Sequence, residues 1–150
     1  MDAVDMGSFD TTDAKPDFGG YINPDSPILH IPGDIHCSWK WHSTWQDALD
    51  PSQQTEFKAA IAQLNFHMNW ASSRYGYILT DAELVLFKKK DNQLATHLYM
   101  AQAIPLTTFD HMSTFSLHHG YLTPLLALWY IHMLAACDDE WSVEILPKEE

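Results

Sequence analysis

The pattern of polar and apolar positions changes several times along the chain, and each change marks an expected element of secondary structure. From Gly33 to His42 the two kinds of residue alternate, which predicts a β-strand because successive side chains of a strand point to opposite faces. The apolar face would carry Ile35, Cys37, Trp39 and Trp41. The polar face would carry Asp34, His36, Ser38, Lys40 and His42.

An apolar stripe that repeats every three to four residues predicts a helix from Asp50 to Ser72. Asp50 can cap the first turn, and Pro51 suits the first helical position. The stripe that would pack against the sheet consists of Phe57, Ile61, Leu64, Met68 and Ala71.

A second helix is expected from Leu125 to about Ala136, after the capping pair Thr123 and Pro124. This segment is apolar on nearly every side. Because helices of that kind lie in the interior of a protein, we expect this one to be buried all round.

Between the two helices, strand-like runs follow one another closely. Tyr75–Thr80 and Glu83–Phe87 flank the short connection Asp81–Ala82 and predict a hairpin. A third strand of the meander is expected within Leu94–Ile104, and Thr107–Gly120 would be a long loop. These elements predict an α+β (α/β) fold: a small mixed β-sheet of about four strands with two main helices.

The N-terminal residues differ in composition from the rest. Residues 1–20 are polar and rich in aspartate and glycine, which predicts a disordered acidic tail. Three prolines make Tyr21–Pro32 extended and irregular, with a short strand at Ile28–Ile31. We therefore expect a single globular α/β domain over residues 21–150.

The charge of the chain bears on its partners. Among 150 residues, 20 acidic side chains outnumber 8 basic ones, and the net charge is −12. A nucleic-acid partner requires a clustered basic surface. The basic cluster of the sequence, Lys88–Lys90, is better explained as a solvated loop or as a guard of a strand edge. The composition therefore predicts no binding to nucleic acid.

Cysteine usage and apolar runs bear on the compartment. Cys37 and Cys137 follow no ligand spacing and are expected to be reduced core residues. The acidic start of the chain resembles neither a signal peptide nor a transit peptide. The longest apolar run, Leu122–Cys137, is short for a membrane span. We expect a cytoplasmic protein with no membrane partner.

The polar face of the Gly33–His42 strand is the first candidate for chemistry. An acid, two imidazoles and an amine on one face can transfer protons near neutral pH, and tryptophans beside them would shift their pKa values. An ordinary solvated strand face explains the same residues equally well. The histidines His111, His118 and His119 have no zinc-motif spacing, so we expect no bound metal.

Three segments occur in a familiar order: IPGDIHCSWKW, then QLNFHMNWASSRYGYILTDAELVLFKK, then LTPLLALWYIHMLAA. Together they resemble a family of fungal proteins that is similar to the C-terminal core of the PD-(D/E)XK nuclease-like superfamily. The resemblance covers about residues 27–137 and implies the strand, helix, hairpin and helix of that core.

Members of that superfamily use an acidic-x-Lys pair on one strand to hold Mg²⁺ and to aid the attacking water. Here Asp34 matches the acid, but His36 stands at the lysine position. Gln63 matches the family's helix motif, but His67 stands at its tyrosine position. The upstream ligand-bearing strand has no room before the match. The resemblance therefore implies a degenerate nuclease that neither cleaves nor binds DNA or RNA.

Three functions are compatible with these residues. The first is a repurposed scaffold that binds a small apolar molecule and acts, without metal or cofactor, as a cyclase, isomerase or lyase (pericyclase-like) in fungal specialised metabolism. The second is a non-catalytic interaction or regulatory domain, and the third is a metal-dependent nuclease completed by a partner chain. We expect the first, because titratable groups replace the lost motif residues. Whether the chain forms a homodimer is left open.

The first function assigns two sets of residues. The catalytic groups would be Asp34, His36, Lys40, Gln63 and His67. The substrate-binding residues would be Trp39, Trp41, Tyr75, Tyr77 and His132. Asp34, His36 and Gln63 would converge on a largely apolar pocket bordered by Trp39 or Trp41.

Overall fold

The computed structural model of the chain describes residues 16–21, 29–90, 98–107 and 122–137. In chain order, the elements are β1 (Phe18–Tyr21), β2 (Leu29–Ile35), the 3-10 helix η1 (Ser43–Asp47), α1 (Pro51–Trp70), β3 (Tyr75–Leu79), β4 (Glu83–Lys89), β5 (Leu98–Met100), β6 (Ile104–Pro105) and α2 (Pro124–Cys137).

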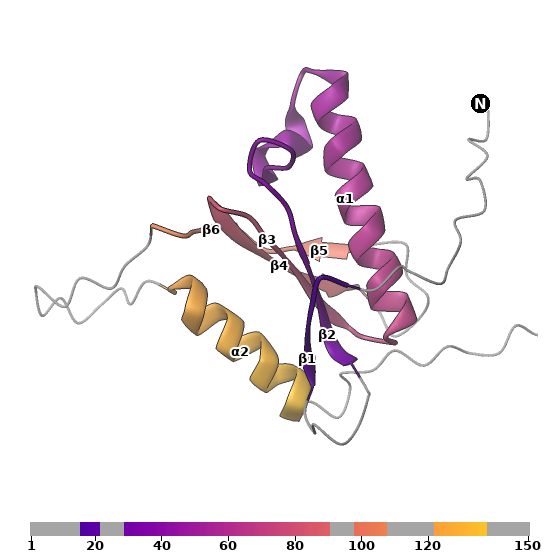
Figure 1. Cartoon of the computed structure of the whole chain (residues 1–150), viewed down its shortest axis with the longest axis vertical. Coiled ribbons are helices and arrows are strands. Elements are labelled where there is room, and N and C mark those ends of the chain that lie inside the picture. Colours follow the sequence, from indigo (N-terminus) through magenta and orange to yellow (C-terminus); the bar gives the residue numbers. More distant parts are fainter. Residues whose placement is uncertain (1–15, 22–28, 91–97, 108–121, 138–150) are drawn as a thin grey trace, which may run out of the picture.

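The sheet forms the middle layer of the fold, with α1 on one face and α2 on the other (Figure 1). The strand order is β1-β2-β3-β4-β5, and the short β6 also pairs with β4. β2 and β3 run parallel because α1 connects them as a crossover, and the other pairs are antiparallel. The predicted α+β class, a small mixed sheet with two main helices, is confirmed, although the sheet has six strands.

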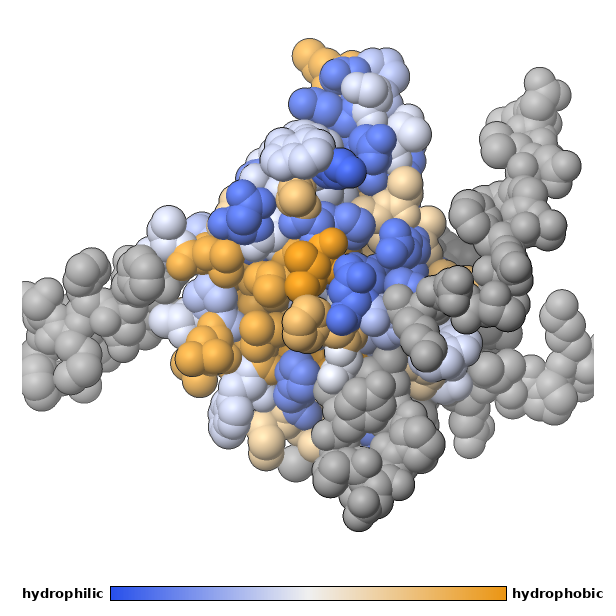
Figure 2. Space-filling view, in the orientation of Figure 1, coloured by the Kyte–Doolittle hydropathy of each residue, from blue (hydrophilic) through white to orange (hydrophobic). Residues whose placement is uncertain are grey.

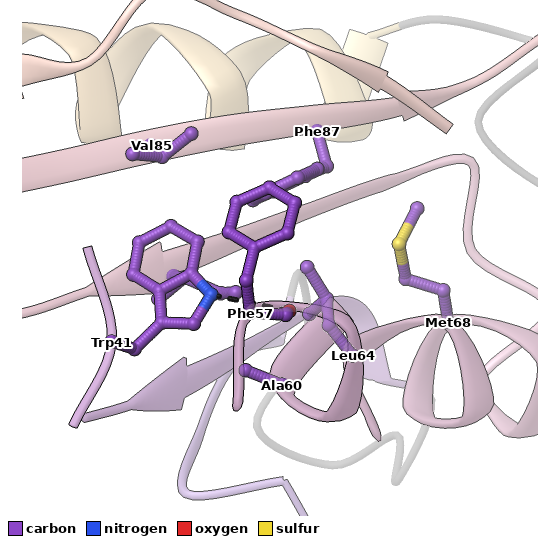
Figure 3. Packing of buried hydrophobic residues seen from close by; sticks show 8 residues of the cluster. Trp41, Phe57, Ala60, Leu64, Met68, Val85 and Phe87 are labelled. Carbon is purple, nitrogen blue, oxygen red and sulfur yellow. Dashed lines mark hydrogen bonds between the residues drawn. The ribbon is translucent and has the colours of Figure 1, made fainter. Parts of the chain in front are cut away.

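α1 begins and packs as its sequence predicts. Asp50 caps the helix by accepting a 2.9 Å hydrogen bond from the Ser52 backbone amide, and Pro51 is the first helical residue. The buried side of the helix joins strand residues and Trp41 in one hydrophobic cluster (Figure 3). The cluster consists of Trp41, Phe57, Ala60, Leu64, Met68, Ile78, Val85 and Phe87.

α2 is the second predicted helix, but the prediction that it is buried all round is wrong. One side packs against the opposite face of the sheet through Ala127, Ile131 and Ala135, which contact a cluster containing Tyr77 and Leu84. The large apolar residues on its other side are exposed. The reason is geometric, since a sheet covers only one face of a helix that lies on it.

The strand predicted from Gly33 to His42 is wrong in its second half, because β2 ends at Ile35. The partner strand β3 ends at Leu79, whose carbonyl accepts the last inter-strand hydrogen bond from the His36 amide at 3.0 Å. Beyond it, the Asp81 carboxylate accepts hydrogen bonds from the Ser38 amide and hydroxyl at 2.6 and 3.0 Å. These contacts turn the chain away from the sheet.

The expected faces of that segment change accordingly. Asp34 is fully buried and Ile35 is 43% exposed, which reverses the expected arrangement. Cys37 is exposed and is not the core residue that was expected. Trp39 is 70% exposed, whereas Trp41 is buried. Within β2 both faces of the sheet are packed against helices, so alternation does not tell which of Asp34 and Ile35 is buried, and beyond Ile35 the chain leaves the sheet and alternation no longer applies.

The predicted hairpin is confirmed, because β3 and β4 pair antiparallel across the connection at Asp81. The third strand of the meander is broken into β5 and β6, which pair with opposite ends of β4. β1, which pairs with β2, was not predicted.

Several sequence-based expectations fall outside the described residues. They concern residues 1–15 of the tail, the loop histidines His111, His118 and His119, and the surroundings of Cys137. Within the part of the chain that is described, no helix combines the length and apolar character needed to cross a membrane.

Candidate functional site

A polar contact in the interior joins β2 to the last turn of α1. Oδ1 of Asp34 lies 2.7 Å from Nδ1 of His67, and the two residues are 0% and 2% exposed. The carboxylate accepts this hydrogen bond when the imidazole carries its proton on Nδ1. Two of the five predicted catalytic residues therefore meet, in the interior of the fold.

Burial dominates the electrostatics of Asp34. Removal from water raises the pKa of the carboxyl group, and His67 opposes the rise through its charge and its hydrogen bond. The second oxygen, Oδ2, is buried with no hydrogen-bond partner among the described residues. A buried carboxyl group with a raised pKa beside an imidazole is typical of a pair that holds or transfers a proton.

His36 follows β2 directly and belongs to the same cluster. Its Nε2 is also buried without a hydrogen-bond partner in the described part of the chain. After burial and His67, the charge of Asp17 raises the pKa of Asp34 and the charge of His36 lowers it. Asp17 is held beside the strand by a 2.9 Å hydrogen bond that its Oδ2 accepts from the Ile35 amide. Asp34 is thus bonded to His67 and lies within electrostatic reach of His36, whereas the expected convergence with Gln63 does not occur.

The other two predicted catalytic residues lie elsewhere. Gln63 is exposed on α1, and Lys40 is exposed in the turn after β2 with its ammonium 5.1 Å from the centre of the Trp39 ring. Trp41 belongs to the core beneath α1, where its ring stacks on Phe57 with centroids 5.8 Å apart (Figure 3). These residues do not converge with Asp34 on one pocket.

The remaining predicted residues, Tyr75, Tyr77 and His132, lie on the α2 face of the sheet. The rings of Tyr77 and His132 are 6.1 Å apart, and Nδ1 of His132 lies 2.7 Å from the Leu128 carbonyl oxygen. Because His67 lies beneath α1 on the other face, the sheet separates it from these three residues. The ten predicted residues therefore do not share one pocket, although burial and, after it, the charge of Asp34 raise the pKa of Tyr77.

A groove that the sequence did not predict runs beside α1. It has a volume of about 350 Å³, and none of the ten predicted site residues is among the described side chains that line it. The lining consists of Gln46, Phe57, Lys58, Ile61, Ala62, Asn65, Phe87, Leu98 and Met100. Oδ1 of Asn65 is buried and has no hydrogen-bond partner among the described residues. The sequence indicates this groove only weakly. The spacing of Lys58, Ile61 and Asn65 places them on one stripe of the helix, but the sequence does not show that the folded sheet places Phe87 opposite them.

Lys89 is another residue whose environment the sequence predicted wrongly. It was expected to be solvated with Lys88 and Lys90, which are exposed, but the alternation along β4 turns Lys89 inward to 1% exposure. Its Nζ donates a 2.8 Å hydrogen bond to Oδ1 of Asn69, and burial lowers the pKa of the amine to about 8.

Comparisons with known proteins find no matching family model, no matching curated protein and no matching solved structure. The resemblance to the nuclease-like superfamily therefore stays a prediction. Within the described ranges, no group of three or more histidine, cysteine, aspartate or glutamate side chains is arranged to hold a metal ion.

Proposed function

We propose that this domain binds a small, largely apolar molecule in the groove between α1, β4 and β5. The observation that carries the proposal is the Asn65 side chain, which lines the groove and whose Oδ1 is buried without a partner among the described residues. Leaving such an acceptor unpaired costs about 1–3 kcal/mol. A ligand that donates a hydrogen bond to it, once a rotation of the amide turns Oδ1 toward the groove, would recover that free energy.

The size and lining of the groove define the class of ligand. A volume of about 350 Å³ lies at the lower end of the range of roughly 300–1,000 Å³ for small-molecule sites. Phe57, Ile61 and Phe87 offer apolar contacts, and Lys58 places a positive charge at the exposed side. The groove therefore suits a molecule with a flat apolar body, one hydrogen-bond donor and a negatively charged end.

The test uses anilinonaphthalene sulfonate, a fluorescent probe with apolar rings, one N–H donor and one anionic group. Ala62→Phe fills the groove, whereas Ala59→Phe adds the same ring to an exposed position of the same helix. We expect the first variant to weaken probe binding by about tenfold or more, equivalent to at least about 1.4 kcal/mol, and the second to leave it unchanged. Equal binding by both variants would refute the groove as the site.

Asn65→Leu tests the acceptor itself. The substitution keeps the branched shape and the number of heavy atoms of the side chain and removes its polar atoms, among them the oxygen without a partner in the described residues, so the free energy of unfolding should stay the same or rise. Probe affinity should fall by roughly threefold to tenfold. If stability falls together with affinity, Asn65 supports the fold and is not a ligand contact.

A second candidate function is the metal-independent isomerisation or cyclisation of a bound small molecule. It is favoured by the cluster in which Asp34 and His36 each bury an atom that has no partner among the described residues, with His67 bonded to Asp34. An isomerisation needs one proton to be given and one to be taken, and a carboxyl group beside imidazoles can do both. None of the three lines the groove, so the substrate would have to reach the end of β2.

Mass-neutral conversion of components in a mixed metabolite extract is the readout for catalysis. Wild-type protein should convert a component into an isomer that chromatography separates, and His67→Gln should abolish the conversion. Glu56→Gln, at an exposed position of the same helix, is the control that should remain active. Conversion that survives His67→Gln, or no conversion by wild-type protein, would exclude this function while leaving the groove proposal intact.

A further inference from the structure

The outward side of α2 carries five large apolar side chains. The exposed fractions are 78% for Leu125, 49% for Leu126, 58% for Trp129, 54% for Tyr130 and 41% for Met133. Hydrophobic residues gather over this helix in the space-filling view (Figure 2). Patches of this kind on a protein surface mark contacts with another molecule.

The outward residues have the spacing of a seam between two helices. Leu126, Trp129, Met133 and Ala136 follow one another at intervals of three, four and three residues. This is the a/d spacing of helices that pack side by side. A helix that is apolar all round is stable when both of its sides are covered, and the sheet covers only one. The seam therefore predicts a second helix as its partner.

The charge distribution favours a second copy of this chain as that partner. Residues 122–137 contain no aspartate, glutamate, lysine or arginine, although the chain has a net charge of −12. Two copies can approach through this uncharged face with the least mutual repulsion. A membrane surface is a poorer match, because helices that lie on membranes carry lysine or arginine beside their apolar side.

The area of the face agrees with a dimer contact. A large side chain has an area of about 150–250 Å². With the exposed fractions given above, the five residues together expose on the order of 600 Å². A specific interface buries about 800 Å² on each partner. The difference between these two areas can come from residues beside the helix, such as Leu122, which is also exposed.

We infer that α2 is the contact surface of a homodimer, in which two copies pack their α2 seams across a two-fold axis. Such a contact is self-complementary, so the same residues serve both copies. Trp129 lies near the middle of the helix, and the axis brings it close to its own symmetry mate. The dimer leaves the groove beside α1 free, because the two helices lie on opposite faces of the sheet.

Sedimentation equilibrium of the full chain tests the inference across micromolar concentrations. Wild-type protein should approach twice the monomer mass of 17.2 kDa. Trp129→Glu should raise the dissociation constant of the dimer at least about tenfold, because buried tryptophans dominate such contacts. Trp70→Glu is the matched control, since Trp70 is exposed to a similar extent (60%) at the end of α1 and should leave the dimer unchanged.

Two further variants keep the test decisive. An equimolar mixture of Trp129→Glu and Trp129→Lys should recover the dimer, because opposite charges then meet across the axis. Leu125→Glu, at the most exposed position of the helix, replaces Trp129→Glu if circular dichroism shows that the latter is unfolded. A wild-type monomer at every concentration, or equal effects of Trp129→Glu and Trp70→Glu, would overturn the inference.

Discussion

Asp34 and His67, which are 33 residues apart in sequence, are joined by a 2.7 Å hydrogen bond with both side chains buried. The contact ties β2 to the end of α1 and holds an acid and an imidazole where water does not reach them. A buried polar pair of this kind is kept either because breaking it destabilises the fold or because its charge is used. Substitutions that change one property of the pair at a time separate these explanations.

The first prediction concerns the charge of Asp34. Asp34→Asn removes a buried charge and keeps an oxygen that can accept from Nδ1 of His67, so the free energy of unfolding at pH 7 should change by less than about 1 kcal/mol. Asp34→Ala leaves the imidazole unpaired and should cost about 1–3 kcal/mol. Urea unfolding measures both values. If the two variants lose equal stability, the carboxylate charge itself supports the fold.

The pH dependence of stability follows from the raised pKa of Asp34. Since burial raises this pKa above its ordinary value of 3.8, the folded state holds the proton more tightly than the unfolded state does. The free energy of unfolding of the wild type, relative to that of Asp34→Asn, should therefore decrease as pH rises from 3.8 to the folded-state pKa and then level off. Urea titrations at stepped pH values check the slope.

Asp81 is a control, because its pKa is shifted in the opposite direction to that of Asp34. Hydrogen bonds from the backbone and side chain of Ser38 lower the pKa of this carboxyl group below 3.8. Its contribution is therefore present above pH 3.8 and is lost as pH falls through the lowered value. The difference between wild type and Asp81→Asn should shrink in acid. If the stability differences of Asp34→Asn and Asp81→Asn from the wild type changed with pH in the same direction, other titrating groups would control stability in acid.

Local signals were sufficient for α1 and for the hairpin. Asp50 and Pro51 start the helix, and the β3–β4 hairpin needs only two adjacent strands and a short connection. The end of β2 depends instead on Leu79, the last residue of a partner strand that is more than 40 residues away. No pattern within Gly33–His42 contains that information.

The candidate site was predictable only in part. Asp34 and His67 meet because β2 and α1 pack on each other, which the stripe of apolar residues on the helix already indicates. The groove beside α1 depends on where β4 and β5 pair, and its acceptor, Asn65, looks like an ordinary helical residue in the sequence. The exposed side of α2 was missed because an all-apolar helix does not show which of its sides the chain itself covers.

Lys89 gives a prediction on the basic side of the pH range. Its pKa of about 8, against an ordinary value of 10.5, means that burying the charged amine costs stability below pH 8. Lys89→Met should raise the free energy of unfolding at pH 7 by on the order of 1–3 kcal/mol. The advantage should shrink between pH 8 and 10.5, where only the unfolded wild-type chain stays protonated. A difference that does not change with pH would show that packing, not charge, is responsible.

Gly33 and Gly76 differ in what an added methyl group would meet. At Gly33 a Cβ atom would lie 2.1 Å from Cζ of the Tyr77 ring, whereas at Gly76 the nearest atom is the flexible Sδ of Met68 at 2.8 Å. Gly33→Ala should destabilise the protein by about 3 kcal/mol or more and Gly76→Ala by about 1–2 kcal/mol. Thermal unfolding ranks the two. Tyr77→Leu should partly rescue the first variant, and no rescue would mean that the backbone of β2 is strained for another reason.

Substitutions of His36 and His67 show whether their cluster has a function or only supports the fold. Nε2 of His36 has no partner among the described residues, so His36→Ala removes an unsatisfied atom and should leave the melting temperature nearly unchanged. His67→Ala breaks the bond to Asp34 and should cost about 1–3 kcal/mol. If the cluster acts on a small molecule, both variants should lose the conversion of that molecule although only one loses stability. A cluster that only supports the fold predicts no conversion by the wild type or by either variant, and no ligand-dependent change in melting temperature in any of the three proteins.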